Sequence, residues 1–356
     1  MTRASSRQGA SGLLARGLLR ARYVAGLPGR RRAAGQAALR ERLAREFPPA
    51  RLAVEAETVT ETLYGRLREE DVAAAERRIR EEPGAWEHYF GTAPRATNHG
   101  LVLALGVWLG CEPVMERTGL ARVEPPEHVH AMARGPLNGA GALYEANMVV
   151  DALLGAGVEM SAMRSALDFG CSSGRVLRPL AASYPHVAWH GCDPNTGAIE
   201  WASENLPGIE FFVSPGVPPL GLGDGSLDLV YAISIWSHFS PRRGLEWLEE
   251  MSRVLAPGAH LVMTTHGAAA VAHYASSPQR PLEQLAEIER DLYRRGWWYA
   301  AEFGAAGDWG VVDPDWGTAF ISAEWLVAQL SPRWRVLEYA PGRNMENQDL
   351  YVLQRV

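Results

Sequence analysis

The sequence predicts an α/β protein with a mostly parallel, Rossmann-like sheet and a helical region in front of it. Two observations support this prediction. After Met163, short apolar runs alternate with amphipathic helical segments, which is typical of βα units in a parallel sheet. Before Met163, the apolar residues follow helical patterns. We therefore expect a helical cap at residues 41–155 and a sheet domain at residues 156–356.

Seven apolar runs define the predicted strands. The first five lie at residues 165–169, 187–192, 209–213, 227–234 and 260–265. Helical segments separate several of them, at residues 175–184, 196–205 and 244–255. After a helix at 322–330, the last two runs occupy 335–339 and 349–353. The short connection between these two suits a hairpin, so we expect the last strand to be antiparallel.

Three helical segments make up the predicted cap. The first, at residues 41–89, is strongly charged with a loose apolar stripe, and Pro83-Gly84 ends it. The second, at 101–110, is apolar on all sides, which indicates a buried helix. The third, at 141–154, ends in glycine.

All 35 basic residues of the chain are arginine. The lack of lysine excludes Schiff-base enzymes, Walker-A phosphate loops and kinase-type ATP sites. Residues 1–40 hold nine arginines and no acid, so the other 316 residues carry 26 arginines against 41 acids, a net charge of −15. We interpret residues 1–40 as a basic disordered arm. A transit peptide and an RNA-binding arm are the alternatives.

Composition also narrows the class of protein. No apolar run approaches the roughly 18 residues of a membrane helix, so we expect no membrane span. Three cysteines fit neither a disulfide framework nor zinc spacing, and His128 and His130 lack a third ligand nearby, so we expect no metal. We interpret the segment around these histidines as a polar surface loop. The acidic body argues against nucleic-acid binding. These features fit a bacterial-like cytoplasmic protein best. Whether the chain forms a homo-oligomer is left open.

The segment ALDFGCSSGRVLRPL, residues 166–180, carries the chemistry. An apolar strand ends in Asp168, and a turn with Gly170 and Gly174 leads into a helix, so backbone amides can approach a ligand closely. About twenty residues on, a second run ends in Asp193, placed to accept hydrogen bonds from ribose hydroxyls. The dinucleotide pattern G-x-G-x-x-G is absent. Asp168 would repel a pyrophosphate and favour a cation instead.

This segment resembles motif I of the class I S-adenosylmethionine-dependent methyltransferases, with Ser172 at the middle glycine position. The resemblance extends from Ala166 to the C-terminus and includes LDLVYAISIWSHFS, APGAHLVMTTHG and DLYVLQRV. It implies a seven-stranded methyltransferase sheet and S-adenosylmethionine as the cofactor. One departure lies after the third strand, where many members have an Asp for the adenine and this chain has Ser214.

The resemblance also implies which residues bind the cofactor. The methionine half is expected against Asp168, Gly170, Cys171 and Gly174, and above Ala232, Ile233 and Ser234. Asp193 is expected at the ribose and Pro194 at the adenine. Tyr144 is a further candidate, because the helix before the first strand often closes over the cofactor; packing on the sheet is the alternative.

Two histidines are candidates for catalysis. Methyl transfer is an in-line displacement in which positioning supplies much of the rate, and a base is needed only when the acceptor must lose a proton. His238 and His266 follow the fourth and fifth runs, at the end of the sheet where ligands bind. A structural hydrogen-bonding role is the alternative for each.

The long interruption at residues 267–320 is predicted to be a substrate lid. Eight of the 28 residues from Tyr293 to Phe320 are aromatic, and acids and glycines lie between them. Aromatic faces beside acids suit a sugar or a flat ring. The predicted acceptor-binding residues are Trp236, Trp298, Trp309 and Asp308. The alternative is that these aromatics only pack the insertion onto the sheet.

Together these observations predict methyl transfer from S-adenosylmethionine to a small-molecule acceptor, with a hydroxyl of a glycan or natural product as the first hypothesis. Two other classes stay open. One is an RNA or protein methyltransferase that holds its substrate with the arginine arm. The other is a non-catalytic binding subunit with the same fold.

Overall fold

The computed structural model describes residues 56–90, 98–276, 279–303 and 307–356, together with a few positions between 38 and 46. The arm predicted at residues 1–40 lies outside the described residues, apart from Ala38, and so does the predicted helical stretch at 47–55.

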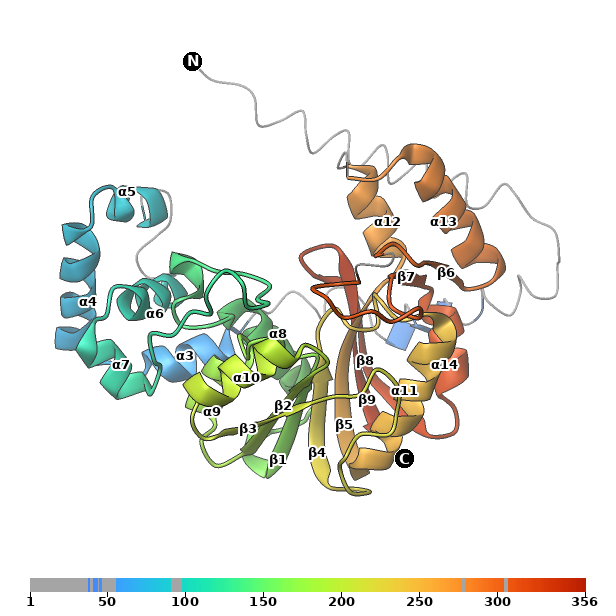
Figure 1. The fold of residues 1–356 in the computed structure, drawn as a ribbon, viewed down its shortest axis with the longest axis horizontal. Helices are drawn as coiled ribbons and strands as arrows, with labels where there is room; N and C mark the ends of the chain where they lie inside the picture. Colours follow the sequence, from blue (N-terminus) through green and yellow to red (C-terminus); the bar gives the residue numbers. More distant parts are fainter. Residues whose placement is uncertain are drawn as a thin grey trace, which may run out of the picture.

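A seven-stranded sheet forms the centre of the molecule (Figure 1), with the strand order β3-β2-β1-β4-β5-β9-β8. Its strands are β1 (Ser165–Phe169), β2 (Ala188–Asp193), β3 (Ile209–Val213), β4 (Leu227–Ala232), β5 (Leu255–His266), β8 (Trp334–Asn344) and β9 (Gln348–Arg355). Strand β9 runs antiparallel to both β5 and β8, and the other pairs are parallel. The predicted fold, including the antiparallel last strand, is confirmed.

Helices flank the sheet on both faces. They are α9 (Leu177–Ser183), α10 (Thr196–Asn205), α11 (Pro241–Val254) and α14 (Ala323–Leu330). Alternate residues of a strand point to opposite faces. Leu229 and Val262 accordingly join a core with the cap and α9, whereas Val230 and Leu261 join a second core with α11 and α14. The sheet is therefore buried on both faces, which explains why its strands appear in the sequence as continuous apolar runs.

The predicted helical cap precedes the sheet and stands at one side of it (Figure 1). Its elements are α3 (Thr58–Tyr64), α4 (Glu69–Glu81), α5 (Ala85–Phe90), α6 (His99–Trp108), α7 (Glu112–Thr118), η3 (Pro136–Asn138), α8 (Leu143–Gly155) and η4 (Met160–Ala162). Helix α6 is buried, as predicted. Pro83-Gly84 separates α4 from α5 instead of ending the helical region, because Gly84 adopts a φ of 74° and the chain turns into a new helix.

The interruption after β5 folds as a separate small unit beside the sheet (Figure 1). It contains α12 (Ala268–Ala275), α13 (Leu282–Arg294), β6 (Trp297–Ala300) and β7 (Thr318–Ile321). Strands β6 and β7 pair with each other in an antiparallel two-stranded sheet. Among the described residues, no helix is long and apolar enough to cross a membrane.

Asp151 of α8 fixes the first cap helix, α3, to a later helix of the cap. Its carboxylate accepts hydrogen bonds from the backbone nitrogens of Glu57 and Thr58, at 3.1 and 3.2 Å, and from the Thr58 hydroxyl at 2.6 Å. These nitrogens belong to the first turn of α3, whose donors have no partner within the helix. A side chain from another helix thus supplies the N-terminal cap of α3.

We predict that Asp151→Ala lowers the free energy of unfolding by about 1–2 kcal/mol, because α3 loses its capping acceptor. Asp151→Asn keeps one acceptor oxygen and should lose less. Urea denaturation followed by circular dichroism measures both changes. Equal midpoints for wild type and Asp151→Ala would contradict this assignment.

Candidate functional site

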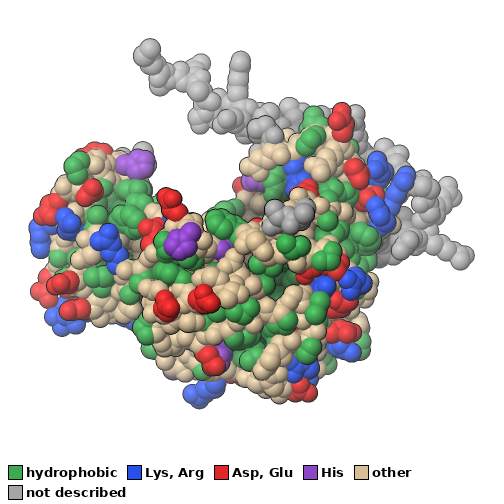
Figure 2. Space-filling view, viewed as in Figure 1, with side chains coloured by type: hydrophobic (Ala, Val, Ile, Leu, Met, Phe, Trp, Pro, Cys, Tyr) green, Lys and Arg blue, Asp and Glu red, His purple; other side chains and the backbone are tan. Residues whose placement is uncertain are grey.

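A cavity of about 1040 Å³ opens at the carboxyl ends of β1, β2, β3 and β4. Residues of the cap, the insertion and the turn between β8 and β9 also line it. Figure 2 shows the surface hollowed between the lobe that contains the cap and the lobe that contains the insertion. Strands β1 and β4 are neighbours at the point where the strand order reverses, which is where open α/β sheets bind ligands.

The turn after β1 brings the backbone into this cavity. Gly170, Ser172 and Gly174 all have positive φ angles, of 87°, 50° and 76°. A Cβ atom at Gly170 would lie 2.1 Å from Cδ1 of Ile235, and one at Gly174 would lie 2.6 Å from Cδ1 of Leu206. Glycine is therefore required at 170 and 174 by both conformation and space. Ser172 occupies the middle glycine position in the left-handed conformation.

Asp168 at the end of β1 lies on the cavity lining, and its side chain is almost fully buried. Its Oδ2 atom has no hydrogen-bond partner among the described residues. Burial raises the pKa of Asp168 to about 8. The Tyr231 hydroxyl beside the carboxyl group opposes this rise, and a donor or cation from a ligand at Oδ2 would further offset the cost of burying the group.

Asp193 ends β2 beside it, with both carboxylate oxygens held by backbone amides. Oδ2 accepts a hydrogen bond from the Ser172 nitrogen at 2.8 Å, and Oδ1 accepts one from the Asn195 nitrogen at 2.8 Å. Burial nevertheless raises the pKa of Asp193. The two bonds fix the carboxylate at the cavity wall, where its remaining lone pairs can accept hydrogen bonds from ligand hydroxyls.

Residues 166–258 match a family model described as a methyltransferase domain. The chain contains a methyltransferase domain. This match confirms the resemblance to the class I S-adenosylmethionine-dependent methyltransferases that the motifs indicated. The match to the family model ends inside β5. The cap, the insertion and the β8–β9 hairpin therefore lie outside the matched part of the chain.

Other comparisons give relatives of low identity. The malonyl-[acyl-carrier protein] O-methyltransferase of Hahella chejuensis is 29% identical over 100 residues, which are 28% of this chain and 35% of that protein. The match therefore spans about a third of the length of this curated relative.

Two solved structures are similar to part of this chain. An S-adenosylmethionine-dependent methyltransferase from Methanosarcina mazei is 22% identical with a TM-score of 0.38, covering 54% of this chain and 92% of its own. A geranyl diphosphate C-methyltransferase from Streptomyces coelicolor A3(2) is 11% identical with a TM-score of 0.39, covering 60% and 80%.

The residues of the methyltransferase domain fit S-adenosylmethionine as its cofactor. The unpartnered Oδ2 of Asp168 suits the ammonium group of the methionine half, and Asp193 suits the ribose hydroxyls. Of the residues predicted to bind the cofactor, most line the cavity: Tyr144, Asp168, Gly170, Cys171, Asp193, Pro194, Ile233 and Ser234. Ser214, at the position of the expected adenine acid, also lines it.

Two predicted cofactor residues do not lie on the lining. Gly174 faces Leu206 and Phe211, so its place is the packing of the turn against α10 and β3. Ala232 is fully buried in the core beneath the cavity floor. Tyr144 is on the lining but is also tied to the β8–β9 turn: its hydroxyl donates to the Arg343 carbonyl at 3.0 Å and accepts from the Met345 nitrogen at 3.1 Å.

The predicted acceptor residues divide into two pairs. Trp236 and Trp298 are 1% and 6% exposed and belong to hydrophobic cores, and their indole nitrogens donate to the Gly244 carbonyl and to Glu287. Their prediction as acceptor-binding residues is corrected: burial of a large apolar ring, not ligand contact, fixes their positions. Asp308 and Trp309 do line the cavity.

The two predicted catalytic histidines also differ. His238 lines the cavity, stacks on Trp316 with ring centroids 4.7 Å apart, and its Nδ1 lies 2.7 Å from the Gly317 carbonyl. A carbonyl only accepts hydrogen bonds, so Nδ1 carries the proton and Nε2 has a free lone pair. Burial lowers the pKa of His238, which keeps the ring neutral at pH 7.

His266 lies outside the cavity lining. It is 6% exposed and packs against Tyr274 and Phe320. Burial lowers its pKa to about 3. The structure therefore places this histidine in the packing between β5 and the insertion, which corrects its choice as a catalytic candidate.

His130 was missed by the sequence analysis. Its segment was interpreted as a polar surface loop, which suits the exposed His128 but not His130. Nδ1 of His130 lies 3.1 Å from the Ser172 hydroxyl, and its ring lies 5.0 Å from that of Trp309. Nothing in the local sequence indicates this contact, because it joins three segments far apart in the chain. No group of three potential metal ligands occurs in the described part of the chain.

A second missed group lies in the β8–β9 turn, where Asn344, Asn347 and Gln348 line the cavity. The Thr264 hydroxyl donates to Oε1 of Gln348 at 2.7 Å, and Nδ2 of Asn344 donates to the same atom at 3.0 Å. The side-chain amide oxygens (Oδ1) of Asn344 and Asn347 are buried without a hydrogen-bond partner among the described residues. The sequence signal that could have indicated these cavity residues is the polar run N-M-E-N-Q between two apolar strands.

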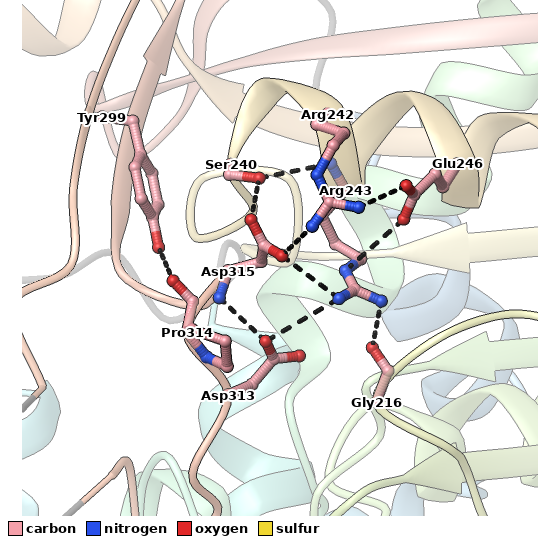
Figure 3. A network of polar contacts seen from close by, with 9 residues as sticks. All are labelled: Gly216, Ser240, Arg242, Arg243, Glu246, Tyr299, Asp313, Pro314 and Asp315. Atoms are coloured by element: carbon pink, nitrogen blue, oxygen red, sulfur yellow. Dashed lines mark hydrogen bonds and ion pairs between the residues drawn. The ribbon is translucent and has the colours of Figure 1, made fainter. Parts of the chain in front are cut away.

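Ion pairs hold the insertion to the methyltransferase domain (Figure 3). The buried guanidinium of Arg243 in α11 donates to the Gly216 carbonyl at 3.0 Å and to Asp315 at 3.2 Å, and lies 4.0 Å from Asp313. Gly216 belongs to the loop after β3, and both acids belong to the insertion. Burial raises the pKa of Asp315, but hydrogen bonds from Ser240 and Arg243 outweigh this effect and hold the pKa below its ordinary value.

We predict that affinity for S-adenosylhomocysteine rises up to about tenfold between pH 6 and pH 7. With a pKa of about 8, Asp168 is mostly neutral in the free protein at these pH values, and the ligand ammonium binds the ionised form, whose population grows as pH rises. Titration calorimetry of wild type and Asp168→Asn measures this. The variant should bind more weakly and lack this component of the pH dependence; parallel pH curves would contradict the assignment.

Proposed function

We propose that this chain transfers a methyl group from S-adenosylmethionine to a hydroxyl group of a small molecule, on a glycan or another natural product. The observation that carries the proposal is one continuous cavity. It is lined by Asp168 and Asp193 at one end, and by His238, Asn344 and Asn347 elsewhere. Its volume of about 1040 Å³ suits a cofactor together with a second small molecule.

The cofactor end of the cavity is formed by the ends of β1 and β2. When bound, S-adenosylmethionine supplies a methyl group activated by its sulfonium charge. Asp168 holds the ammonium group and Asp193 holds the ribose hydroxyls. The backbone of the turn at Gly170 and Cys171 is anchored by hydrogen bonds from both nitrogens to the Cys192 carbonyl, at 2.8 and 3.0 Å. The turn is thus fixed before the cofactor binds, which favours accurate positioning.

His238 is the proposed general base. The Gly317 carbonyl fixes the tautomer that leaves Nε2 as an acceptor, and the stacked Trp316 ring fixes the plane of the imidazole. Bound S-adenosylmethionine would supply its methyl group to the acceptor oxygen and would leave as the neutral thioether, which keeps the electron pair of the broken carbon–sulfur bond. Nε2 of His238 takes the proton that the acceptor hydroxyl loses.

The acceptor end is supported by the direction of a hydrogen-bond chain. The Ser234 nitrogen donates to the Thr264 hydroxyl at 2.8 Å, so that hydroxyl must donate onward to Oε1 of Gln348. Because Oε1 accepts, the Asn344 amide turns its nitrogen toward it and its oxygen away. The Asn347 nitrogen donates to the Tyr274 hydroxyl at 3.4 Å, so its side-chain oxygen, like that of Asn344, has no donor among the described residues, and the hydroxyl groups of an acceptor molecule are the proposed donors.

Binding of S-adenosylhomocysteine tests the proposal at its first step. We expect titration calorimetry to show binding to the full chain, and at least tenfold weaker binding to Asp193→Ala, which loses the ribose acceptor. The exposed Glu200 in α10 offers a matched control, Glu200→Ala, which should bind as wild type does. No heat from the intact protein would refute the proposed function.

His238→Ala tests the catalytic step. We expect turnover to fall by a factor of about 10² to 10⁴, because the proton acceptor is lost, with the affinity for S-adenosylhomocysteine changed less than twofold. The acceptor is first found by screening hydroxyl-bearing metabolites for methylated products by mass spectrometry. His128→Ala, at an exposed histidine outside the cavity lining, is the control. Unchanged turnover in His238→Ala would remove this residue from the mechanism.

A further inference from the structure

A tight hairpin in the insertion presents Trp309 at its tip. Asp308 and Val311 exchange backbone hydrogen bonds of 2.9 Å in both directions, which leaves Trp309 and Gly310 as the two turn residues. Their φ angles are 48° and 82°, so both are left-handed. Such turns normally carry Asn, Asp or Gly, and a bulky residue at positive φ is a true outlier that calls for a reason.

Packing does not supply that reason, because Trp309 is 52% exposed. The chain thus accepts an unfavourable backbone conformation and leaves a large apolar ring half uncovered at the edge of the cavity. Tryptophans inside the same insertion behave differently: Trp298 is 6% exposed within a core. An exposed ring on a cavity lining is available to a ligand.

The contacts of Trp309 connect it to Asp193, the residue proposed to bind the ribose. Nδ2 of Asn195 donates to the Trp309 carbonyl at 3.2 Å, and the backbone nitrogen of the same Asn195 donates to Asp193 at 2.8 Å. On a second path, the Trp309 ring lies 5.0 Å from the His130 ring, which contacts Ser172, and the nitrogen of Ser172 donates to Asp193. Both paths end at the carboxylate that fits the ribose.

The rest of the loop is anchored at the same end of the cavity. Arg243 joins Asp313 and Asp315 of the loop to Gly216, which follows β3 and lines the cavity next to Ser214 (Figure 3). A Cβ atom at Gly216 would lie 3.3 Å from Oδ2 of Asp313. The insertion loop is therefore packed directly on the loop that is expected to border the adenine.

We propose that Trp309 binds the adenine ring of the cofactor by stacking, and that the insertion hairpin is a lid on the nucleoside end of the cavity. The inference rests on the proposed function. The sequence predicts that Trp309 and Asp308 bind the acceptor molecule, whereas the proposed stacking places them at the nucleoside end of the cofactor. With the hairpin over the nucleoside, the acceptor reaches the methyl group from the other end of the cavity, between the cap and the β8–β9 turn.

Titration calorimetry with two probes tests this. S-adenosylhomocysteine contains both halves of the cofactor, whereas 5′-methylthioadenosine lacks the amino-acid half. We expect Trp309→Ala to weaken both probes by a similar factor of about ten, since stacking on the base is lost from each. Trp309→Phe, which keeps an aromatic face, should restore most of the affinity. Trp309→Leu, which keeps apolar volume without a ring, should not.

Two controls separate the contributions. Asp168→Asn should weaken S-adenosylhomocysteine but leave 5′-methylthioadenosine unchanged, because only the first probe carries an ammonium group. Val312→Ala changes a 63% exposed residue of the same loop that does not line the cavity, and should bind both probes as wild type does.

The outcomes distinguish this inference from the proposed function. Failure of the wild-type chain to bind either probe would overturn both. Binding by wild type with unchanged affinity in Trp309→Ala would overturn the stacking assignment and leave the proposed function standing. Weakening of S-adenosylhomocysteine alone would place Trp309 at the amino-acid half and overturn it as well. Equal affinities of Trp309→Phe and Trp309→Leu would show that the ring face is not used.

Discussion

One buried guanidinium holds together three segments around the cavity. Arg243 is 5% exposed and joins the loop after β3, the N-terminal end of α11 and the insertion loop (Figure 3). A buried charge without its partners costs several kcal/mol, so the three segments are held as one arrangement. Further along the insertion, Gly317 makes two hydrogen bonds with His238. The Gly317 nitrogen donates to the His238 carbonyl at 2.8 Å, and the Gly317 carbonyl accepts from the His238 ring. The position of the proposed base therefore follows from how the insertion is anchored.

Much of the fold was predictable because its signals are local. The central strands β1 and β4 are buried on both faces, so each appears as an apolar run, and β1 was predicted to the residue. The edge strand β3 is less buried but is still apolar, and it was also predicted to the residue. The short link before β9 indicated a hairpin and hence the antiparallel strand. Helix α7 was not predicted, since a seven-residue helix between loops has too few turns for a clear period.

The positions of the residues proposed to bind the cofactor were predictable for a related reason. Asp168, Gly170 and Asp193 lie at strand ends and in a turn whose spacing is fixed by the sheet. The acceptor end was not, because it is assembled from contacts between distant segments. Composition alone could not separate Trp298, buried in a core, from Trp309, exposed on a hairpin tip. The decisive difference is the backbone turn at residues 308–311, which has no unambiguous sequence signal when a tryptophan occupies it.

The charged residues on the cavity lining are mainly acids. Asp168, Asp193 and Asp308 line it, while the guanidinium of Arg175 on the same lining is paired with Glu145 at 2.8 Å. In a chain without lysine, no flexible ammonium group can reach in to neutralise these acids. Burial keeps Asp168 mostly neutral in the free protein, so its negative charge and its attraction for a cation develop as the cation binds. The sulfonium charge of S-adenosylmethionine disappears when the methyl group leaves, so the same acids that favour binding of the methyl donor favour its product less.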